Sequence, residues 1–388
     1  MKIAIISPAF FESTFPLAKY LALNNDITLY CFLNQSSLSP PMLNLSGLTK
    51  TGLLNENETQ ELLPSDVKAY FNNSGVSIKV IVCGNSKKIG TLTIWQFIKE
   101  LKKNNFDKLH FVGEEFRFNF IQYFFPAKKV VQTLHEGDAD RLTKRTGKLK
   151  TLFIKAFLNR LGNSSIKLIF HSKNVKSVFL KNYAKKAKEL TAVIPFGLFE
   201  TYEYITTTSV KLNIPEKYFL YYGYIEQYKG LDLLLEAIRQ VNVVNSEIDF
   251  VIAGRDKGGL VNIDGLSNVA FINRFLTEQE IVFMVKNAVA IIMPYKTASQ
   301  SGIPNTAFCF DVPIIASDIA GLNHVVKHGK NGLLFKPGSV DELAQNILIL
   351  QDDKLMVNKL RGNIAEKTDF ESWEMLALKT SDFYKFKL

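Results

Sequence analysis

Short apolar runs that alternate with amphipathic segments restrict the fold of this chain more than any other feature. In the first half, such runs predict buried strands at residues 2–7, 27–33, 76–82, 108–112, 129–133, 167–170 and 192–194. In the second half they predict strands at 218–225, 247–253, 288–293, 312–316 and 333–335. Helical segments separate the strands: residues 16–23 have a helical apolar stripe, and capping boxes at 277–280 and 339–342 predict the starts of two helices. Strands of this length, separated by helices, are typical of doubly wound parallel sheets. We therefore predict an α/β protein.

The length of the chain predicts two domains. Its 388 residues are more than one hydrophobic core usually serves. Residues 201–216 have little periodicity and contain the tract TTTS, so we predict a linker there, between domains at 1–200 and 217–369. The closing segment, 370–388, has the apolar pattern of a helix.

The charge of the chain suggests an anionic partner. The formal net charge is +10, and residues 141–188 contain 14 Lys or Arg and no Asp or Glu. A basic amphipathic helix in this stretch can lie on an anionic membrane, and a solvated basic face over a core-facing stripe explains it equally well. No helix-turn-helix, finger or RNA-binding motif accompanies the charge, so nucleic acid is not predicted as a partner.

The cysteines and the apolar runs indicate a compartment. Cys31, Cys83 and Cys309 are isolated, which predicts buried thiols in a reducing environment. No apolar stretch reaches the roughly twenty residues that span a bilayer, and residues 1–11 are too short for a signal peptide. We expect a cytoplasmic protein, with 141–188 as its candidate contact to the inner face of the cell membrane.

Two places in the sequence are candidate ligand sites. In the second half, residues 294–317 predict a strand, a polar loop, a short helix that begins at Pro304, and a second strand. Gly302 would leave room for a ligand, and the N–H groups of the helix start would bind an anion. In the first half, Glu114, His135 and Glu136 follow predicted strands, where ligands of open α/β sheets bind. A solvated loop residue is an equally good interpretation of Glu114.

Six blocks of the second half, in this order and spacing, resemble glycosyltransferase family 4. They are GYIEQYKGLDLLLEAI from Gly223, DFVIAGRD from Asp249, NVAFINRFLTEQEI from Asn268, PYKTASQSGIPNTAF from Pro294, VPIIASDIAGLNHVV from Val312 and KNGLLFKPGSVDELAQNI from Lys330. In the first half the resemblance is limited to HSKNVKS from His171 and AVIPFG from Ala192.

The resemblance implies the GT-B fold, in which two Rossmann-like doubly wound domains face each other across a cleft. The N-terminal domain would bind the acceptor, the C-terminal domain would bind a nucleotide sugar, and the closing helix would pack back on the first domain. The implied reaction moves a sugar from a UDP- or GDP-sugar to a glycan or lipid-linked acceptor, with retention, in cell-surface polysaccharide synthesis. It implies no cofactor and no metal, because the nucleotide sugar is a substrate.

The resemblance also assigns roles to residues. His135 matches a histidine near the reacting sugar, and Lys229 matches a lysine that contacts the donor diphosphate. Glu114 and Glu136 are candidates on the acceptor side. The remaining predicted donor-binding residues are Gly223, Tyr224, Arg255, Gln300, Ser301, Gly302, Ile303, Pro304, Asn305 and Thr306.

The chain departs from the family at charged positions. Tyr224 stands in place of an arginine beside the phosphates, and Ala298 and Thr306 stand in place of two glutamates. His324 replaces a further acidic residue. We hypothesise that Arg255 or Arg274 supplies the missing positive charge. A non-catalytic GT-B binding or scaffolding protein is the alternative function, and another GT-B enzyme, such as an epimerase or a phosphorylase, is a third.

Overall fold

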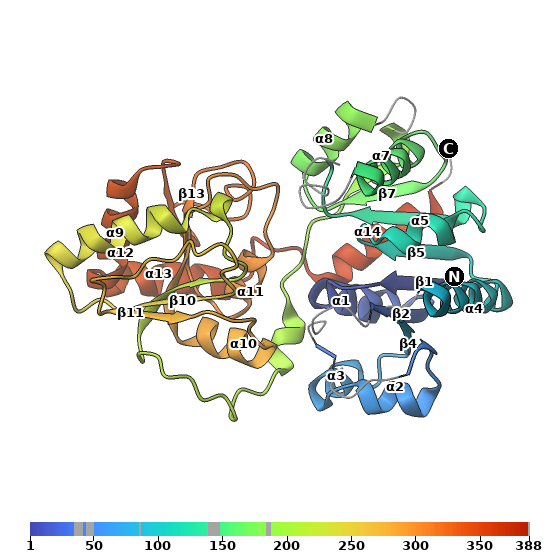
Figure 1. Cartoon of the computed structure of the whole chain (residues 1–388), viewed down its shortest axis with the longest axis horizontal. Helices are drawn as coiled ribbons and strands as arrows, with labels where there is room; N and C mark the ends of the chain where they lie inside the picture. Colours follow the sequence, from blue (N-terminus) through green and yellow to red (C-terminus); the bar gives the residue numbers. More distant parts are fainter. Residues whose placement is uncertain (35–41, 44–49, 85–86, 139–147, 184–187, 387–388) are drawn as a thin grey trace. The chain divides into compact units, whose positions relative to one another are not determined.

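The computed structural model describes residues 1–34, 42–43, 50–84, 87–138, 148–183 and 188–386 (Figure 1). The chain forms two compact units. The first comprises Met1–Gly197 together with Glu371–Leu388, and the second comprises Leu198–Phe370. Residues 201–204 of the predicted linker lie in a 3-10 helix, η3 (Glu200–Tyr204), and its Thr201 and Tyr202 are buried in the second unit.

The first unit is built on a sheet with the strand order β3-β4-β2-β1-β5-β6-β7-β8. All neighbouring strands are parallel except the pair of β3 and β4. The strands are β1 (Lys2–Ser7), β2 (Asp26–Asn34), β3 (Gly52–Leu53), β4 (Ser77–Cys83), β5 (Lys108–Val112), β6 (Val130–Leu134), β7 (Lys167–Phe170) and β8 (Thr191–Val193).

Helices cover both faces of this sheet, because alternate strand residues point to opposite sides. Ile3 and Ile5 of β1 belong to one core, and Ala4 and Ile6 belong to the other. The first core is closed by α1 (Phe11–Leu21), α2 (Glu56–Leu62), α3 (Ser65–Phe71) and α14 (Trp373–Lys385). The second is closed by α4 (Lys87–Asn104), α5 (Phe116–Gln122), α7 (Lys148–Gly162) and α8 (Lys173–Tyr183). Helix α14 therefore packs on the first unit, although it follows the second unit in the chain.

The second unit has a parallel sheet with the order β11-β10-β9-β12-β13-β14. Its strands are β9 (Tyr218–Tyr222), β10 (Phe250–Ala253), β11 (Val269–Ile272), β12 (Ala288–Met293), β13 (Ile314–Ser317) and β14 (Gly332–Phe335). The helices are α9 (Leu231–Val244), α10 (Glu278–Asn287), α11 (Ile303–Cys309), α12 (Val340–Asp352) and α13 (Lys354–Ala365). Two Rossmann-like parallel-sheet units confirm the predicted α/β class.

Two local predictions need correction. Helix α1 begins at Phe11, ahead of the predicted start at Pro16, which lies inside the helix at the cost of one backbone donor. Only one of the two hydrogen bonds of the predicted capping box at Ser339 forms. The Ser339 hydroxyl accepts from the Glu342 N–H at 3.3 Å, but the Glu342 carboxylate accepts from the Lys336 N–H at 2.6 Å instead of returning to residue 339.

In the described part of the chain, no helix is both long and apolar enough to cross a membrane. The cysteine prediction is confirmed as to burial, since Cys31, Cys83 and Cys309 are buried and unbridged.

Candidate functional site

The strand order of the second sheet defines a topological switch point. From β9 the chain moves outward to β10 and β11, and it then returns to β12 on the other side of β9. The carboxyl ends of β9 and β12 therefore flank a crevice in which ligands of open parallel sheets bind. Gly223 follows β9 and Pro294 follows β12, so the loops that begin there form the candidate site.

Lys229 is the charged group of this crevice. It ends the short 3-10 helix η4 (Gln227–Lys229) and is only 9% exposed. Its ammonium lies 3.2 Å from the point where a Cβ on Gly223 would stand, and 5.6 Å from the centre of the Tyr295 ring. No hydrogen bond or ion pair joins this ammonium to another described residue. Burial lowers the pKa of Lys229 to about 8, opposed by the nearby Glu226 carboxylate.

Glycines let the loops around Lys229 approach one another. Gly230 has φ +67°, and a Cβ there would stand 1.9 Å from the carbonyl oxygen of Pro294. Gly254, with φ +150°, would place a Cβ 1.8 Å from the carbonyl oxygen of Gly223. Side chains at these two positions are excluded, because real Cβ atoms do not come so close to a carbonyl oxygen. The loops after β9, β10 and β12 are thus locked together around the lysine.

The start of helix α11 differs from the prediction. A Cβ on Gly302 would stand 2.9 Å from the Phe199 ring, so an aromatic side chain fills the space that we expected for a ligand. The Ile303 N–H donates to the Ser301 hydroxyl at 3.3 Å, and the Asn305 and Thr306 N–H groups donate to the Gly302 carbonyl. The expectation of free amides is therefore wrong for residues 303–306, where Pro304 also has no N–H.

The side chains of this loop are partly buried. Tyr295 is buried beside Lys229 and forms a hydrogen bond with Ser301. Asn305 and Thr306 are buried, and Gln300 is half-buried. Tyr295 carries no sequence signal beyond its place after a strand, and the sequence analysis did not select it.

The two arginines of the charge hypothesis differ in their partners. Arg274 forms a two-pronged ion pair with Glu280, with N–O distances of 2.7 Å and 2.5 Å. Arg255 lies over the Phe275 ring, 4.8 Å from its centre, and forms no ion pair with a described residue. Tyr224 is 58% exposed and meets the same Phe275 ring edge-on. Arg255 is the arginine that remains available to an anion.

The positions of the missing carboxylates are occupied in three different ways. A Cβ on Gly321 would stand 2.2 Å from the Ala298 carbonyl oxygen, so the backbone of Ala298 lies directly against Gly321. Thr306 forms a side-chain hydrogen bond with Tyr222, and His324 is exposed, with Nδ1 donating to the Ala320 carbonyl at 3.3 Å.

A carboxyl group that the sequence analysis missed lies near Tyr222. Burial raises the pKa of Glu278 to about 7, and the hydrogen bond with Tyr202 opposes this shift. Its Oε2 has no hydrogen-bond partner among the described residues. The only sequence signal is a glutamate in the first turn of α10, which is ordinarily a surface position.

In the first unit, His135 lies in a stack of rings at the end of β6. Phe10 packs parallel to its imidazole at 3.8 Å and 13°, and the His171 ring lies on it at 4.9 Å. Phe196 stacks on His171 at 3.8 Å. Burial, together with repulsion between the two imidazoles, keeps the pKa of His135 well below its usual 6.5. His135 is therefore a neutral group near pH 7.

Glu114 supports the segment that carries His135. Its Oε1 accepts from the His135 N–H at 2.5 Å and from the Glu136 N–H at 2.8 Å. Burial raises the pKa of Glu114 to about 7, and these hydrogen bonds act against the rise. The interpretation as a solvated loop residue is wrong, and Glu114 positions its neighbours. Glu136 accepts from the Gly137 N–H at 3.0 Å.

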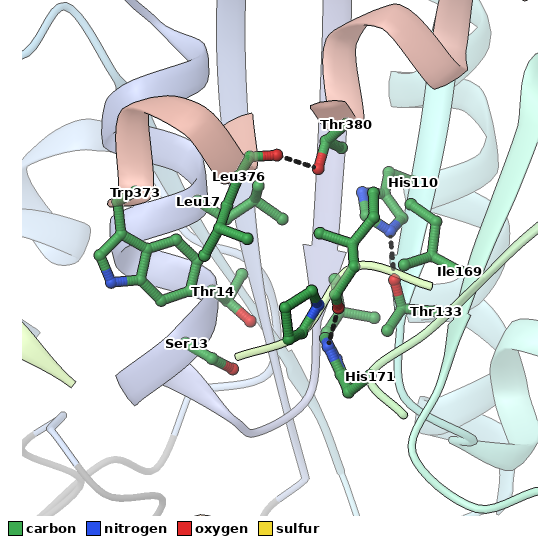
Figure 2. A pocket seen from close by; sticks show the side chains of 13 residues that line it. Ser13, Thr14, Leu17, His110, Thr133, Ile169, His171, Trp373, Leu376 and Thr380 are labelled. Carbon is green, nitrogen blue, oxygen red and sulfur yellow. Dashed lines mark hydrogen bonds between the residues drawn. The ribbon is translucent and has the colours of Figure 1, made fainter. Parts of the chain in front are cut away.

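A small cavity with polar and apolar lining lies deeper in the first unit, between α1, α14 and the sheet (Figure 2). His110 bridges Tyr384 and Thr133 there, with both hydrogen bonds at 2.6 Å, and His171 Nδ1 donates to the Ile194 carbonyl. The cavity volume is about 20 Å³, which is room for about one water molecule. It is too small for a sugar.

The described residues contain no group of three or more His, Cys, Asp or Glu side chains that could hold a metal ion. That the protein needs no metal and no cofactor stays a prediction.

A known protein family matches the second half of this chain. Residues 205–368 match the family model of the glycosyl transferases group 1. Over 151 residues, the chain is 24% identical to the alpha-D-kanosaminyltransferase of Streptomyces kanamyceticus, covering 38% of this chain and 39% of that protein. Over 202 residues, it is 22% identical to the D-inositol 3-phosphate glycosyltransferase of a Nocardioides species, covering 46% and 44%. The chain thus spans less than half the length of these two relatives.

Solved structures are similar over the whole chain. Sucrose-phosphate synthase from Thermosynechococcus elongatus aligns with a TM-score of 0.67 at 15% identity, covering 99% of this chain and 98% of that one. Anabaena Alr3699/HepE in complex with UDP and glucose aligns with a TM-score of 0.66 at 15% identity, covering 100% of both. These identities show the fold alone, and the fold is that of the GT-B glycosyltransferases. Assignment to family 4 stays a prediction.

Proposed function

We propose that this chain is a glycosyltransferase that binds a nucleotide-sugar donor at the switch point of its second sheet. The observation that carries the proposal is Lys229, a buried ammonium that forms no hydrogen bond or ion pair with a described residue and for which the Glu226 carboxylate compensates only in part. Burying a cation is unfavourable unless an anion compensates it. The diphosphate of a nucleotide sugar supplies such an anion, and a relative of the same fold, Alr3699/HepE, has been solved in complex with UDP.

The chemistry follows from where charge develops. As the bond between the anomeric carbon and the diphosphate oxygen breaks, negative charge grows on the departing diphosphate. Lys229 and Arg255 would stabilise this charge. The acceptor hydroxyl oxygen forms the new bond to the anomeric carbon, and its proton passes to the departing diphosphate oxygen. We propose His135 as a neutral hydrogen-bonding group for the reacting sugars. Retention, a UDP- or GDP-sugar donor, a glycan or lipid-linked acceptor, and a role in cell-surface polysaccharide synthesis are parts of the same proposal.

A non-catalytic binding protein of the same fold is the second candidate. It is favoured by Ala298 and Thr306, which leave this loop without the two expected carboxylates. The two candidates differ in turnover, because a binding protein would hold a nucleotide sugar without releasing the free nucleotide.

Thermal shift with UDP, GDP, ADP and CMP, each with and without a divalent metal ion, tests the proposal. A ligand at 100 times its dissociation constant stabilises the native state by about 2.7 kcal/mol. We expect one nucleotide to raise the melting temperature, and we expect Lys229→Met to reduce the rise at the same nucleotide concentration. Lys359→Met changes an exposed lysine of α13 and should keep the full rise. No response to any nucleotide would contradict the proposal, and binding without turnover of the matching sugar nucleotides would favour the binding protein.

A further inference from the structure

Six large apolar side chains are exposed on three helices of the first unit. Their exposed fractions range from 42% for Trp95 to 66% for Leu152. Helices α4, α5 and α7, or the turn that directly follows α5, carry them. We call them the aromatic face: Leu92, Trp95, Phe120, Tyr123, Leu152 and Phe153. Isolated exposed leucines are ordinary, but a gathering of this kind marks an interaction surface.

Contacts join the three helices on one side of the unit. All three pack into the same hydrophobic core, so they cover the same face of the first sheet. The Trp95 and Phe120 rings meet edge-on at 5.9 Å, which links α4 to α5. The Arg160 guanidinium of α7 lies 3.8 Å from the centre of the Tyr123 ring. Figure 1 shows α4, α5 and α7 following one another along the first unit.

The charge on the helices of the aromatic face is mostly positive. The sequences of the three helices contain a single acidic residue, Glu100, and its carboxylate is bonded to Lys79 at 2.6 Å. The exposed basic residues of α4 and α7 include Lys99, Lys102, Lys103 and Lys155. An anionic surface would therefore meet complementary charge across the whole face.

We propose that the aromatic face docks the protein on an anionic lipid bilayer. Tryptophan and tyrosine favour the boundary between headgroups and acyl chains, because each has an apolar body and a polar tip. Leucine and phenylalanine insert between the acyl chains, and the lysines meet the lipid phosphates. A second copy of this chain is a poorer occupant, since two such faces would bring lysines against lysines. Nucleic acid would leave the leucines without a partner, because an aliphatic side chain does not stack on bases as an aromatic ring does.

This surface overlaps the contact that the sequence predicted only at α7, which carries Leu152 and Phe153. The basic stretch 141–188 was the expected contact, and its residues 141–147 and 184–187 lie outside the described part of the chain. Trp95, Phe120 and Tyr123 lie outside that stretch altogether, on helices that the sequence analysis did not connect with a membrane. The proposal stands apart from the transferase function, because it can be measured without a nucleotide.

Vesicle flotation of the full chain tests the proposal, with one vesicle of phosphatidylcholine and one of equal parts phosphatidylcholine and phosphatidylglycerol. We expect flotation with the anionic vesicles, little with the neutral ones, and weaker binding at high salt. The double variant Trp95→Ser/Phe120→Ser should lose at least tenfold in partitioning. Leu152→Ser/Phe153→Ser should lose as well, and it tests the face independently should the first variant fail to fold.

The matched control is Val243→Ser/Val244→Ser on α9 of the second unit, where the two side chains are 87% and 71% exposed. It removes apolar groups that are more exposed than those of the aromatic face, and it should float like the unaltered protein. Equal flotation of all variants would overturn the proposal. Binding to single-stranded RNA but not to vesicles would overturn it too, and so would a dimer that dissociates when the aromatic face is altered.

Discussion

The switch points of the two sheets have the same topology and opposite contents. In the first unit, β1 and β5 flank the switch point, and the Phe10 ring lies there against Gly113 and His135. In the second unit, β9 and β12 flank it, and Lys229 is buried between loops that glycines bring together. One crevice thus contains stacked aromatic rings around a neutral imidazole, whereas the other contains a buried cation. The fold therefore supplies the position of a site, and a few side chains after each strand decide which ligand it binds.

In the cationic crevice, a substitution at Gly254 should lower the free energy of unfolding more than one at any other position considered. A Cβ there would collide with the Gly223 carbonyl at 1.8 Å, in a backbone conformation that other residues rarely adopt. We expect Gly254→Ala to destabilise the second unit by about 3 kcal/mol or more. Gly259→Ala is the control, since φ is +62° there and a Cβ would meet nothing within 4 Å. It should cost about 1 kcal/mol. Similar urea midpoints for both variants would contradict this account.

Replacing Lys229 should weaken nucleotide binding without lowering the stability of the protein. Removing a charge-assisted contact to a diphosphate costs about 1.5–3 kcal/mol, so Lys229→Met should bind nucleotide roughly 10- to 100-fold more weakly. The same change removes a buried cation without a described partner, and the melting temperature without ligand should stay equal or rise. Calorimetric titration and thermal unfolding measure the two effects. A large fall in melting temperature would mean that the lysine is chiefly structural.

In the aromatic crevice, replacing Phe10 should change the pKa of His135. It adopts φ +61°, a left-handed conformation that costs a residue with a side chain about 1–2 kcal/mol. Phe10→Gly relieves this strain and uncovers one face of His135. We expect the pKa of His135 to rise toward 6.5, as followed by NMR of the imidazole protons of the five histidines. An unchanged titration would show that Phe10 does not shield His135.

The same histidines set the acid sensitivity of the first unit. His135 and His171 have folded-state pKa values below 6.5, and that of His171 is about 4. Above pH 6.5 these groups are neutral in both states and stability is independent of their titration. Below it, the unfolded chain binds more protons at these histidines, so their contribution to stability falls as the pH decreases from about 6.5 toward 4. His110, with a folded-state pKa of about 3, adds to this fall, whereas Glu114, with its raised pKa, opposes it. Phe10→Gly should reduce the fall, and urea unfolding at a series of pH values measures it.

Replacing the two arginines should change nucleotide binding least, and it should show which of them belongs to the cationic site. Arg255→Ala should weaken nucleotide binding by about 1 kcal/mol, because its guanidinium is partly solvated. Arg274→Ala removes the Glu280 ion pair and should leave nucleotide binding unchanged. The reverse ranking would mean that Arg274 exchanges its carboxylate for the ligand.

Most of the fold could be predicted from local pattern. Strands β1, β5, β7 and β12 lie where their apolar runs predict them, and the capping box at Thr277 forms with both of its hydrogen bonds. Two-residue β3 could not be predicted, because so short a run has no period. The start of α1 was misplaced because Pro16 imitates a helix N-terminus, while the backbone turns into the helix at Phe10.

The candidate site was predicted only as a set of residue types. Lys229 was selected from the family resemblance and Arg255 from its place after a strand, yet nothing in the sequence separates Arg255 from Arg274. That distinction rests on the reach of Glu280 across a turn. Gly302 was expected to face a ligand and instead faces Phe199, a residue about a hundred positions earlier in the chain.

The sequence by itself determined the alternation of strands and helices, because side-chain periodicity and capping act over a few neighbouring residues. The tertiary structure alone decided which groups are buried and which have partners, since burial depends on residues far apart in the chain. Lys229 is an ordinary lysine in the sequence, and it becomes a buried cation when the loops after β9 and β12 close over it. Glu114 is an ordinary loop carboxylate until the end of β6 offers it two N–H groups.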